Sequence, residues 1–431
     1  MAIARAQLEA IVDALTVVLP AREPADAQLR RFFREHKNLG QRDRGVVADT
    51  VYAALRRRRL LESVTPAATP REIALATLVK VQGVGLAQVE SAIAPEEKAW
   101  LMSLKALDLD TLPFAVRADL PDWVIERLRP VLGEEELLAL ARGLQDPAPL
   151  DLRVNTLKAP REGVLDRLAF DEIEAAPTRH SPLGVRLRGK PALNQHPMFL
   201  DGAVEVQDEG SQLLGMLVEA RRGEMVVDFC AGAGGKTLQM GAAMDSTGRI
   251  YAFDVSDKRL DHLAPRLKRS GLSNVFPQRI ANENDAKVKR LRGKIDRVLV
   301  DAPCTGLGTL RRNPDLKFRQ TEAGLAELNA KQRAILAGAA SLVKPGGRLV
   351  YGTCSLLREE NEAIVEEFLA AHPDFRIVPA GPILEHAGVK LAMPGPYLRL
   401  YPHVHGTDGF FAAVMDRAPA AKAAPAEKPA P

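Results

Sequence analysis

The segment VVDFCAGAGGKT (Val226–Thr237) decides the fold class of this 431-residue chain. It joins an apolar strand pattern that ends at Asp228 to a helical pattern through a glycine-rich turn, and such a turn lets the backbone approach a ligand closely. A phosphate-binding P-loop would need glycine in place of Cys230, and a dinucleotide-binding GxGxxG turn would need glycine in place of Thr237. The segment therefore matches neither of these nucleotide-binding loops.

A different nucleoside ligand remains compatible with the loop. The next predicted strand ends at Asp254, and an acidic residue at this place suits the hydroxyl groups of a ribose. Because the loop has no phosphate to hold, it fits a nucleoside-type ligand such as S-adenosylmethionine. Glycine-rich matches are weak by themselves, so a turn without a ligand stays an alternative at this point.

Strands and helices alternate after Gly223, which predicts an α/β fold with a mainly parallel sheet. The strands of this sheet are expected at Met225–Phe229, Ile250–Asp254, Val275–Ile280, Val298–Asp301 and Arg348–Tyr351, with a last one at Phe410–Val414. Two earlier stretches, Leu150–Val154 and Ala203–Gln207, also have strand character.

Four regions follow from these patterns. Residues 1–145 are predicted to be all-helical, 146–222 to form a small α/β connecting subdomain, and 223–416 to form a Rossmann-like domain. Residues 417–431 are rich in Ala and Pro and are expected to be a disordered tail.

The composition excludes several classes of protein. The hydrophobic fraction of 46% and the charged fraction of 26% are typical of a soluble globular protein, and no apolar run approaches the roughly 20 residues of a membrane span. The three cysteines show no CxxC and no Cys/His spacing, which excludes a structural zinc site and fits a reducing cytoplasm. The net charge of +4 names no partner.

Two of the cysteines follow predicted strands. Cys304 ends the stretch Asp301-Ala302-Pro303-Cys304, and Cys354 follows Thr353 after a later strand. Ligands of open α/β sheets bind beyond the carboxyl ends of the strands, so both thiols are expected to face the pocket of the glycine loop. A single cysteine is usually a small buried hydrophobe, and Cys230 fits that reading or lines the cofactor site.

A thiol and a methyl-sulfonium donor together suggest methylation of a pyrimidine at carbon 5. A thiolate that adds to carbon 6 makes carbon 5 nucleophilic, and an acid such as Asp301 near N3 can hydrogen-bond or protonate the ring. A second thiol can assist elimination, and the base must be unstacked to reach the site. The residues alone do not decide which thiol attacks.

From about Leu150 to Val414 the chain resembles the RNA cytosine-5 methyltransferases of the Sun/nucleolar-protein type. The resemblance rests on the loop Asp228–Thr237, the DAPC motif at 301–304 and the TC motif at 353–354. It implies a Rossmann-like, S-adenosylmethionine-dependent methyltransferase domain with no metal. It also implies that Cys354 is the nucleophile, that Cys304 helps to release the product, and that Asp301 stabilises the adduct.

The same resemblance implies the residues that bind the cofactor. They are Cys230, Ala231, Gly232, Ala233, Gly234, Gly235 and Lys236 in the loop, with Asp254 and Asp301. The family usually has an acid near the adenine, and Asn282 stands at the matching position here, with Asp285 close by as an alternative.

The N-terminal helices resemble the NusB-like RNA-binding domain of the bacterial small-subunit rRNA member of this family, mainly at Gln41–Arg44. This resemblance implies that a monomer methylates 16S rRNA in the small ribosomal subunit precursor, with RNA binding also by 146–222. A tRNA cytosine-5 enzyme and a non-catalytic RNA-binding assembly factor are the alternatives. Arg56, Arg57, Arg311 and Arg312 are expected to contact RNA phosphates, although solvated basic faces would show the same pattern.

Overall fold

The computed structural model describes residues 3–189 and 191–420, and the chain folds into two compact units. Within the described residues, the helical unit comprises 3–148, 305–325 and 401–406, and the sheet unit comprises 149–189, 191–304, 326–400 and 407–420. No helix in the described part of the chain is long and apolar enough to cross a membrane. The last strand includes Arg417, and residues 421–431 of the predicted tail lie outside the described residues.

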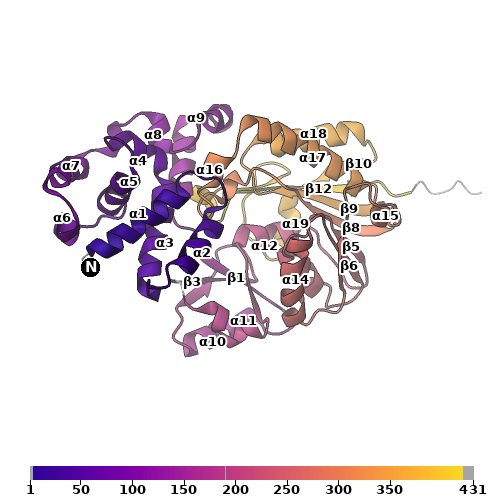
Figure 1. The fold of residues 1–431 in the computed structure, drawn as a ribbon. Coiled ribbons are helices and arrows are strands. Elements are labelled where there is room, and N and C mark those ends of the chain that lie inside the picture. The colour runs from indigo at the N-terminus through magenta and orange to yellow at the C-terminus, as the bar shows by residue number, and fades with distance from the viewer. Residues whose placement is uncertain (1–2, 190, 421–431) are drawn as a thin grey trace, which may run out of the picture. The chain divides into compact units, whose positions relative to one another are not determined.

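The helical unit is built from amphipathic helices, as the sequence predicts (Figure 1), and those between residues 5 and 106 share one apolar core. Leu8, Ile11 and Leu15 on the first helix are fully buried because they recur at helical spacing. The helices of the N-terminal part are α1 (Arg5–Val18), α2 (Ala25–Glu35), α3 (Gln41–Arg56), α4 (Arg58–Val64), α5 (Pro70–Ala76), α6 (Leu86–Val89), α7 (Pro95–Ala106), α8 (Phe114–Ala118) and α9 (Asp122–Gln145).

Two later segments of the chain complete the helical unit. They carry α16 (Leu316–Arg319) and α20 (Pro402–His405). The Lys317 ammonium of α16 is buried and donates to Asp119 Oδ1 at 2.6 Å and to the Arg56 carbonyl at 2.9 Å. These contacts fix the segment that follows Cys304 to helices more than 190 residues earlier in the chain.

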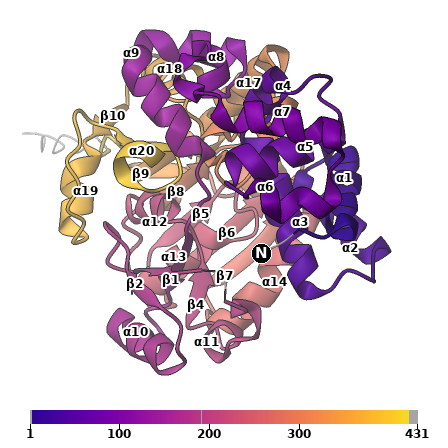
Figure 2. The same cartoon turned by 90° about the vertical axis from the view of Figure 1, so that its left-hand side faces the viewer.

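The sheet unit begins with a small antiparallel sheet in the order β2-β3-β1-β4 (Figure 2). Its strands are β1 (Leu150–Val154), β2 (Ala175–Pro177), β3 (Gly184–Leu187) and β4 (Val204–Val206), accompanied by α10 (Arg161–Phe170) and α11 (Pro197–Leu200). Both strand-like stretches noted in this part of the sequence form strands.

The main sheet of the same unit has the order β10-β12-β9-β8-β5-β6-β7, and β11 pairs with β12. Strands β5 to β9 run parallel, whereas β12 is antiparallel to β9 and to β10. The strands are β5 (Met225–Asp228), β6 (Arg249–Asp254), β7 (Val275–Arg279), β8 (Ile295–Asp301), β9 (Val343–Thr353), β10 (Phe375–Val378), β11 (Leu398–Leu400) and β12 (Phe410–Arg417). The predicted Rossmann-like sheet is therefore confirmed, with two further strands at one edge.

Helices cover both faces of this sheet, so its central strands are apolar on both sides (Figure 1). One face packs against α12 (Glu209–Met216), α13 (Gly235–Ala243), α14 (Asp257–Ser270) and α19 (Ala380–His386); the other packs against α17 (Glu322–Ala340), α18 (Glu362–Ala371) and the short α15 (Ala286–Lys289). Neighbours β5 and β8 mark the point where the strand order reverses, and ligands bind there in open α/β sheets.

Candidate active site

The two strand-end cysteines lie side by side. Cys304 follows β8, Cys354 follows β9, and these strands are parallel neighbours in which Asp301 pairs with Gly352. The two sulfur atoms are 3.4 Å apart, and neither cysteine forms a disulfide; both residues are partly exposed. The parallel register therefore brings two residues 50 positions apart to one place at the carboxyl edge of the sheet.

A buried hydrogen-bond network joins the two cysteine loops. The Gln332 amide on α17 donates to the carbonyl of Pro303 at 2.9 Å and to Glu360 Oε1 at 3.0 Å. Glu360 Oε2 in turn accepts a hydrogen bond from the hydroxyl of Ser355, the residue after Cys354. Gln332 and Glu360 are fully buried, so one amide and one carboxylate fix the backbone on both sides of the thiol pair.

Two more buried side chains hold the residue before Cys354. The Thr353 hydroxyl donates to Asn361 Oδ1 at 2.5 Å, and the Asn361 amide donates to the Ser355 carbonyl at 3.1 Å. The sequence analysis did not predict this network. The signal in the sequence that could have indicated it is Gln332, a polar residue three and four positions before the apolar Ile335 and Leu336.

An ion pair lies beside the thiols. The Lys236 ammonium is 2.6 Å from Asp301 Oδ2, and only a tenth of the Lys236 side chain is exposed. Burial alone would lower the pKa of Lys236, but the charges of Asp301, Asp228 and Cys354 outweigh it and raise that pKa. The sequence analysis predicted Lys236 only as a residue of the cofactor-binding loop. The structure also pairs its side chain with Asp301, a candidate catalytic residue.

The glycine loop adopts a conformation that requires glycine. Gly232 and Gly234 have φ angles of +55° and +82°, and a Cβ at Gly234 would lie 2.1 Å from a Leu263 methyl group. Asp254 at the end of β6 accepts hydrogen bonds from the backbone N–H groups of Gly232 at 2.9 Å and Ser256 at 2.8 Å. The predicted ribose acid therefore also fixes the loop.

The walls around this loop are acidic. Asp228 is buried and accepts a hydrogen bond from the Thr237 hydroxyl at 2.6 Å, while its Oδ1 has no partner within the described ranges. Burial raises the pKa of Asp228 to about 7. Burial and the neighbouring carboxylates also raise the pKa of the Cys230 thiol well above its usual value, so this cysteine stays protonated.

S-adenosylmethionine is a cofactor that these residues fit. Asp254 pairs with Arg259 at 3.8 Å and Asp301 pairs with Lys236 at 2.6 Å. The remaining acceptor directions of these two carboxylates, with the buried carboxyl group of Asp228, suit a ligand that carries hydroxyl and cationic groups. The ligand carries a sulfonium and an ammonium group. Each carboxylate oxygen has more than one acceptor direction, so Asp254 can hold the loop and still accept hydrogen bonds from hydroxyls.

The two candidates for the adenine contact, Asp285 and Asn282, differ in the hydrogen bonds that their side chains already make within the protein. Asp285 caps α15 and accepts backbone hydrogen bonds from Ala281 at 2.8 Å and Lys287 at 2.9 Å, which lower its pKa. Asn282 is exposed, and its side-chain oxygen accepts a hydrogen bond from the Asn284 backbone at 2.8 Å. The carboxylate of Asp285 therefore serves the local helix, and Asn282 keeps its side-chain amide group for other contacts.

The predicted RNA-binding arginines all belong to the helical unit. Arg56, Arg57 and Arg311 line one cavity of that unit, and the Arg56 guanidinium donates to the Arg311 carbonyl at 2.8 and 3.1 Å. Arg312 is partly buried next to Arg311 but does not line this cavity. The structure thus brings three of the four predicted RNA-binding arginines together in one cavity.

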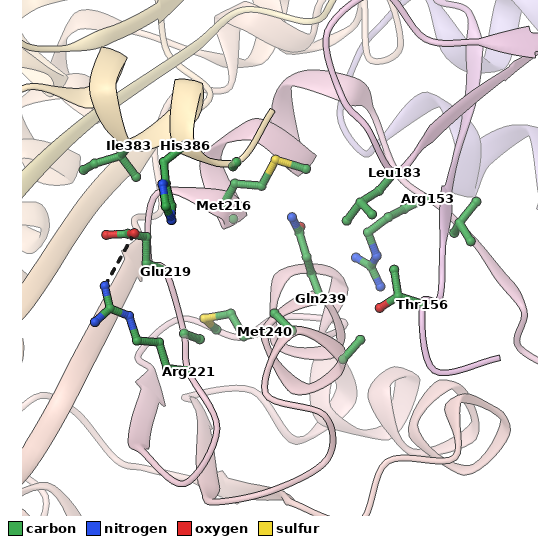
Figure 3. A pocket seen from close by; sticks show the side chains of 16 residues that line it. Arg153, Thr156, Leu183, Met216, Glu219, Arg221, Gln239, Met240, Ile383 and His386 are labelled. Carbon is green, nitrogen blue, oxygen red and sulfur yellow. Dashed lines mark ion pairs between the residues drawn. The ribbon is translucent and has the colours of Figure 1, made fainter. Parts of the chain in front are cut away.

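A separate pocket of about 400 Å³ lies among α12, α13, α19 and β1 of the sheet unit. Figure 3 shows Met216, Met240 and Gln239 between a group with Arg153 and a group with the Glu219–Arg221 ion pair. None of the candidate catalytic residues lines it. The buried Arg153 donates to the Gly235 carbonyl at 2.5 Å and so supports the start of α13 instead.

The fold and the site together define a Rossmann-like methyltransferase with paired cysteines at the sheet edge. The family model described as 16S rRNA methyltransferase RsmB/F matches residues 215–416, and the RsmF/B-like ferredoxin-like domain matches residues 120–194. The chain belongs to this RsmB/F family, because its similarity to a curated member spans most of both sequences.

That relative is the probable ribosomal RNA small subunit methyltransferase B of Synechocystis, 36% identical over 344 residues that cover 79% of this chain and 77% of the relative. The protein of the same description from Bacillus subtilis is 30% identical over 340 residues, covering 78% and 76%. The solved structure of PH0851 superimposes with a TM-score of 0.79 at 27% identity and covers 97% of this chain and 100% of its own. A methyltransferase homologue from Pyrococcus horikoshii gives 0.61 at 29% identity, covering 72% and 100%.

Proposed function

We propose that this protein transfers the methyl group of S-adenosylmethionine to carbon 5 of a cytosine in small-subunit rRNA. The observation that carries the proposal is the thiol pair, 3.4 Å between sulfur atoms, beside the Lys236–Asp301 ion pair. The names of the relatives, ribosomal RNA small subunit methyltransferase B, supply the class of substrate. Bacterial rRNA is made and assembled in the cytoplasm, so the proposal places the protein there.

The Cys354 thiolate adds to carbon 6 of the base, and the electron pair of the 5,6 double bond becomes available at carbon 5. Lys236 supports this step because its ammonium interacts favourably with a negative charge on Cys354. The cofactor supplies the methyl group when bound, held by the loop Cys230–Lys236, by Asp254 and by Asn282. These residue roles are part of the proposal.

Asp301, the residue proposed to stabilise the adduct, acts while it is paired with the Lys236 ammonium. A carboxylate paired with an ammonium accepts hydrogen bonds, so Asp301 orients the base through the N–H donors of cytosine. The proton-bearing member of the pair is Lys236. The pair as a whole therefore supplies both an acceptor for the base and a donor that stabilises the negative charge developing in the adduct.

Cys304 completes the reaction. After methyl transfer the proton on carbon 5 leaves to a base, the C–H electron pair restores the 5,6 double bond, and the bond between carbon 6 and Cys354 breaks to release the thiolate. Cys304 in its thiolate form, next to Cys354, is the group that we assign to this proton removal.

The test uses the purified chain with methyl-labelled S-adenosylmethionine and separate 16S rRNA and tRNA transcripts. We expect label in 5-methylcytidine from 16S rRNA alone. Label only in tRNA would favour the tRNA cytosine-5 enzyme, and no label in either RNA would favour a non-catalytic assembly factor. Mapping 5-methylcytosine in rRNA from cells with and without the protein then identifies the nucleotide.

A further inference from the structure

A cavity of about 890 Å³ in the helical unit has four arginines and one lysine in its lining. We call it the basic cavity and define it by Arg56, Arg57, Lys80, Arg142 and Arg311. These residues come from α3, the turn after it, a π-helical turn (Thr77–Val81), α9 and the segment that follows Cys304. Only the tertiary fold brings them together.

The positive charge of the basic cavity is only partly neutralised within the protein. The acidic side chains that line it are Asp110 and Asp146, and Asp110 is already paired with Arg142 at 2.6 Å. Lys80 donates to the backbone carbonyls of Lys105 at 3.1 Å and Leu107, which are neutral acceptors. Five cationic side chains thus face two carboxylates, and the cavity attracts anions.

Arg57 differs from the two arginines that follow it in the sequence, because the partner of its guanidinium is neutral. Its neighbours Arg58 and Arg59 pair with Glu62 at 2.6 Å and Asp122 at 2.7 Å, whereas Arg57 donates to the side-chain oxygen of Gln145. Burial lowers the pKa of Arg57, so holding this cation in the fold costs free energy that a bound anion would offset. The guanidinium still carries its charge at neutral pH.

His403 of α20 is a second, independent observation that indicates a ligand. Only 13% of its side chain is exposed, and neither ring nitrogen has a hydrogen-bond partner among residues 3–189 and 191–420. The Glu136 carboxylate lies 3.8 Å from Nε2 and forms an ion pair with the ring when the histidine is protonated. Because His403 also lines the basic cavity, a ligand there would supply hydrogen bonds that the ring nitrogens do not make within the described residues.

We propose that the basic cavity binds phosphate groups of the RNA substrate, with Arg57 as the central contact and Arg142, Lys80 and His403 around it. Guanidinium groups bind phosphate oxygens through paired N–H donors, and such contacts position RNA without reading its sequence. The choice of RNA over an acidic protein segment rests on the function proposed above. The cavity thereby deepens that function by adding an RNA-positioning site in the helical unit.

The test measures binding of the full chain to a 16S rRNA transcript between 50 and 300 mM KCl, without S-adenosylmethionine. Arg57→Gln is compared with Arg34→Gln, which removes the same charge from an exposed side chain on α2. We expect Arg57→Gln to weaken binding roughly tenfold and to reduce the salt slope by about 0.7–0.9. Arg34→Gln should change neither quantity. In turnover, Arg57→Gln should raise KM for RNA more than it lowers kcat.

The proposal would be overturned if Arg57→Gln and Arg34→Gln lost RNA affinity equally, or if Arg57→Gln lost none. If Arg57→Gln does not fold, the wild-type chain is crosslinked to a transcript that contains 4-thiouridine, and crosslinks are expected in peptides that carry residues 53–60 or 139–147. Their absence would also overturn it, as would displacement of the transcript by polyglutamate as readily as by RNA of equal charge. Binding that depends on Arg57 without any methyl transfer would instead contradict only the proposed catalytic function.

Discussion

At the scale of single residues, the three cysteines differ in their surroundings. Cys304 and Cys354 are adjacent, with a lysine ammonium near Cys354, whereas burial and the neighbouring carboxylates raise the pKa of Cys230 and keep its thiol protonated. A thiolate is the reactive form of cysteine. The three residues are therefore expected to respond very differently to the same substitution.

Cys354→Ala should abolish methyl transfer, by a factor of roughly 10³ or more, because no other group can form the adduct at carbon 6. Binding of S-adenosylmethionine, measured by calorimetry, should persist because Cys354 does not hold the glycine loop. Cys230→Ala serves as the matched control and should retain methyl transfer, because Cys230 is proposed to contact the cofactor through its backbone. Full activity of Cys354→Ala would contradict its assignment as the nucleophile.

Cys304→Ala should trap the methylated adduct, because the proton on carbon 5 would then lack its acceptor beside Cys354. The expected readout is a slowly migrating protein–RNA band on a denaturing gel after turnover. The band should be absent from the double variant Cys304→Ala/Cys354→Ala. A Cys304→Ala variant that turns over without an adduct would remove Cys304 from product release.

Asp228 should give the stability a distinctive pH dependence. Its pKa is raised from 3.8 to about 7 in the fold, so between these values the native state holds a proton that the unfolded chain has lost. Stability should therefore fall as pH rises from 4 to 7, by up to about 4 kcal/mol, and stay level above pH 7. Denaturant unfolding of Asp228→Asn across this range should lack that slope.

The matched control is Asp285→Asn, because the pKa of Asp285 is lowered by backbone hydrogen bonds. Its contribution is present above its unfolded pKa and is lost as pH falls, the opposite sign to that of Asp228. Parallel pH profiles for the wild type and Asp228→Asn would show that Asp228 is not held in its neutral form.

At the scale of secondary-structure elements, α17 connects the two cysteine loops that follow β8 and β9. Its Gln332 reaches the carbonyl before Cys304 and the carboxylate that holds Ser355 after Cys354. The positions of the two thiols therefore depend on a helix that carries neither of them. Such supporting hydrogen bonds set the geometry that catalysis requires.

Gln332→Ala should lower kcat by roughly 10–100-fold with little change in the affinity for S-adenosylmethionine, because both thiol loops lose their common anchor. Lys331→Ala, an exposed neighbour on α17, should leave kcat unchanged. A shift in the adduct-to-product ratio would separate a positioning role from general destabilisation. Equal kcat values for the two variants would contradict the role of Gln332.

At the scale of the whole molecule, the chain is not a simple series of domains. The segment after Cys304 leaves the main sheet, joins the helical unit and returns within α17. The buried pair of Lys317 and Asp119, 2.6 Å apart, fixes this segment. The helical unit thus needs residues from three parts of the sequence.

Lys317→Met should lower the free energy of unfolding by about 3–5 kcal/mol, because Asp119 would remain buried without its counter-charge. The double variant Lys317→Met/Asp119→Asn should recover part of this loss. Both are measured by denaturant unfolding monitored with circular dichroism. A single variant as stable as the wild type would show that the pair does not anchor the segment.

Much of the fold was predictable because strand and helix periodicity is a local property of the sequence. The strands β5, β6, β7 and β8 lie within three residues of their predicted ends, since each contains an apolar run bounded by polar or glycine residues. Strand β9 begins five residues before its predicted start, where the sequence is polar and glycine-rich. The short edge strands β10 and β11 were not predicted, because their pairing with β12 gives them strand structure more than their own pattern does.

The sequence by itself determined the parallel sheet, the glycine loop and the positions of the three cysteines relative to the strands. Only the tertiary structure decided which groups meet: the 3.4 Å contact of Cys304 and Cys354, the pairing of Lys236 with Asp301, and the bridge through Gln332. Strand order and long-range packing set these contacts between residues 28 to 65 positions apart. A local pattern cannot specify them, because the free energy that brings such residues together comes from burial across the whole sheet unit.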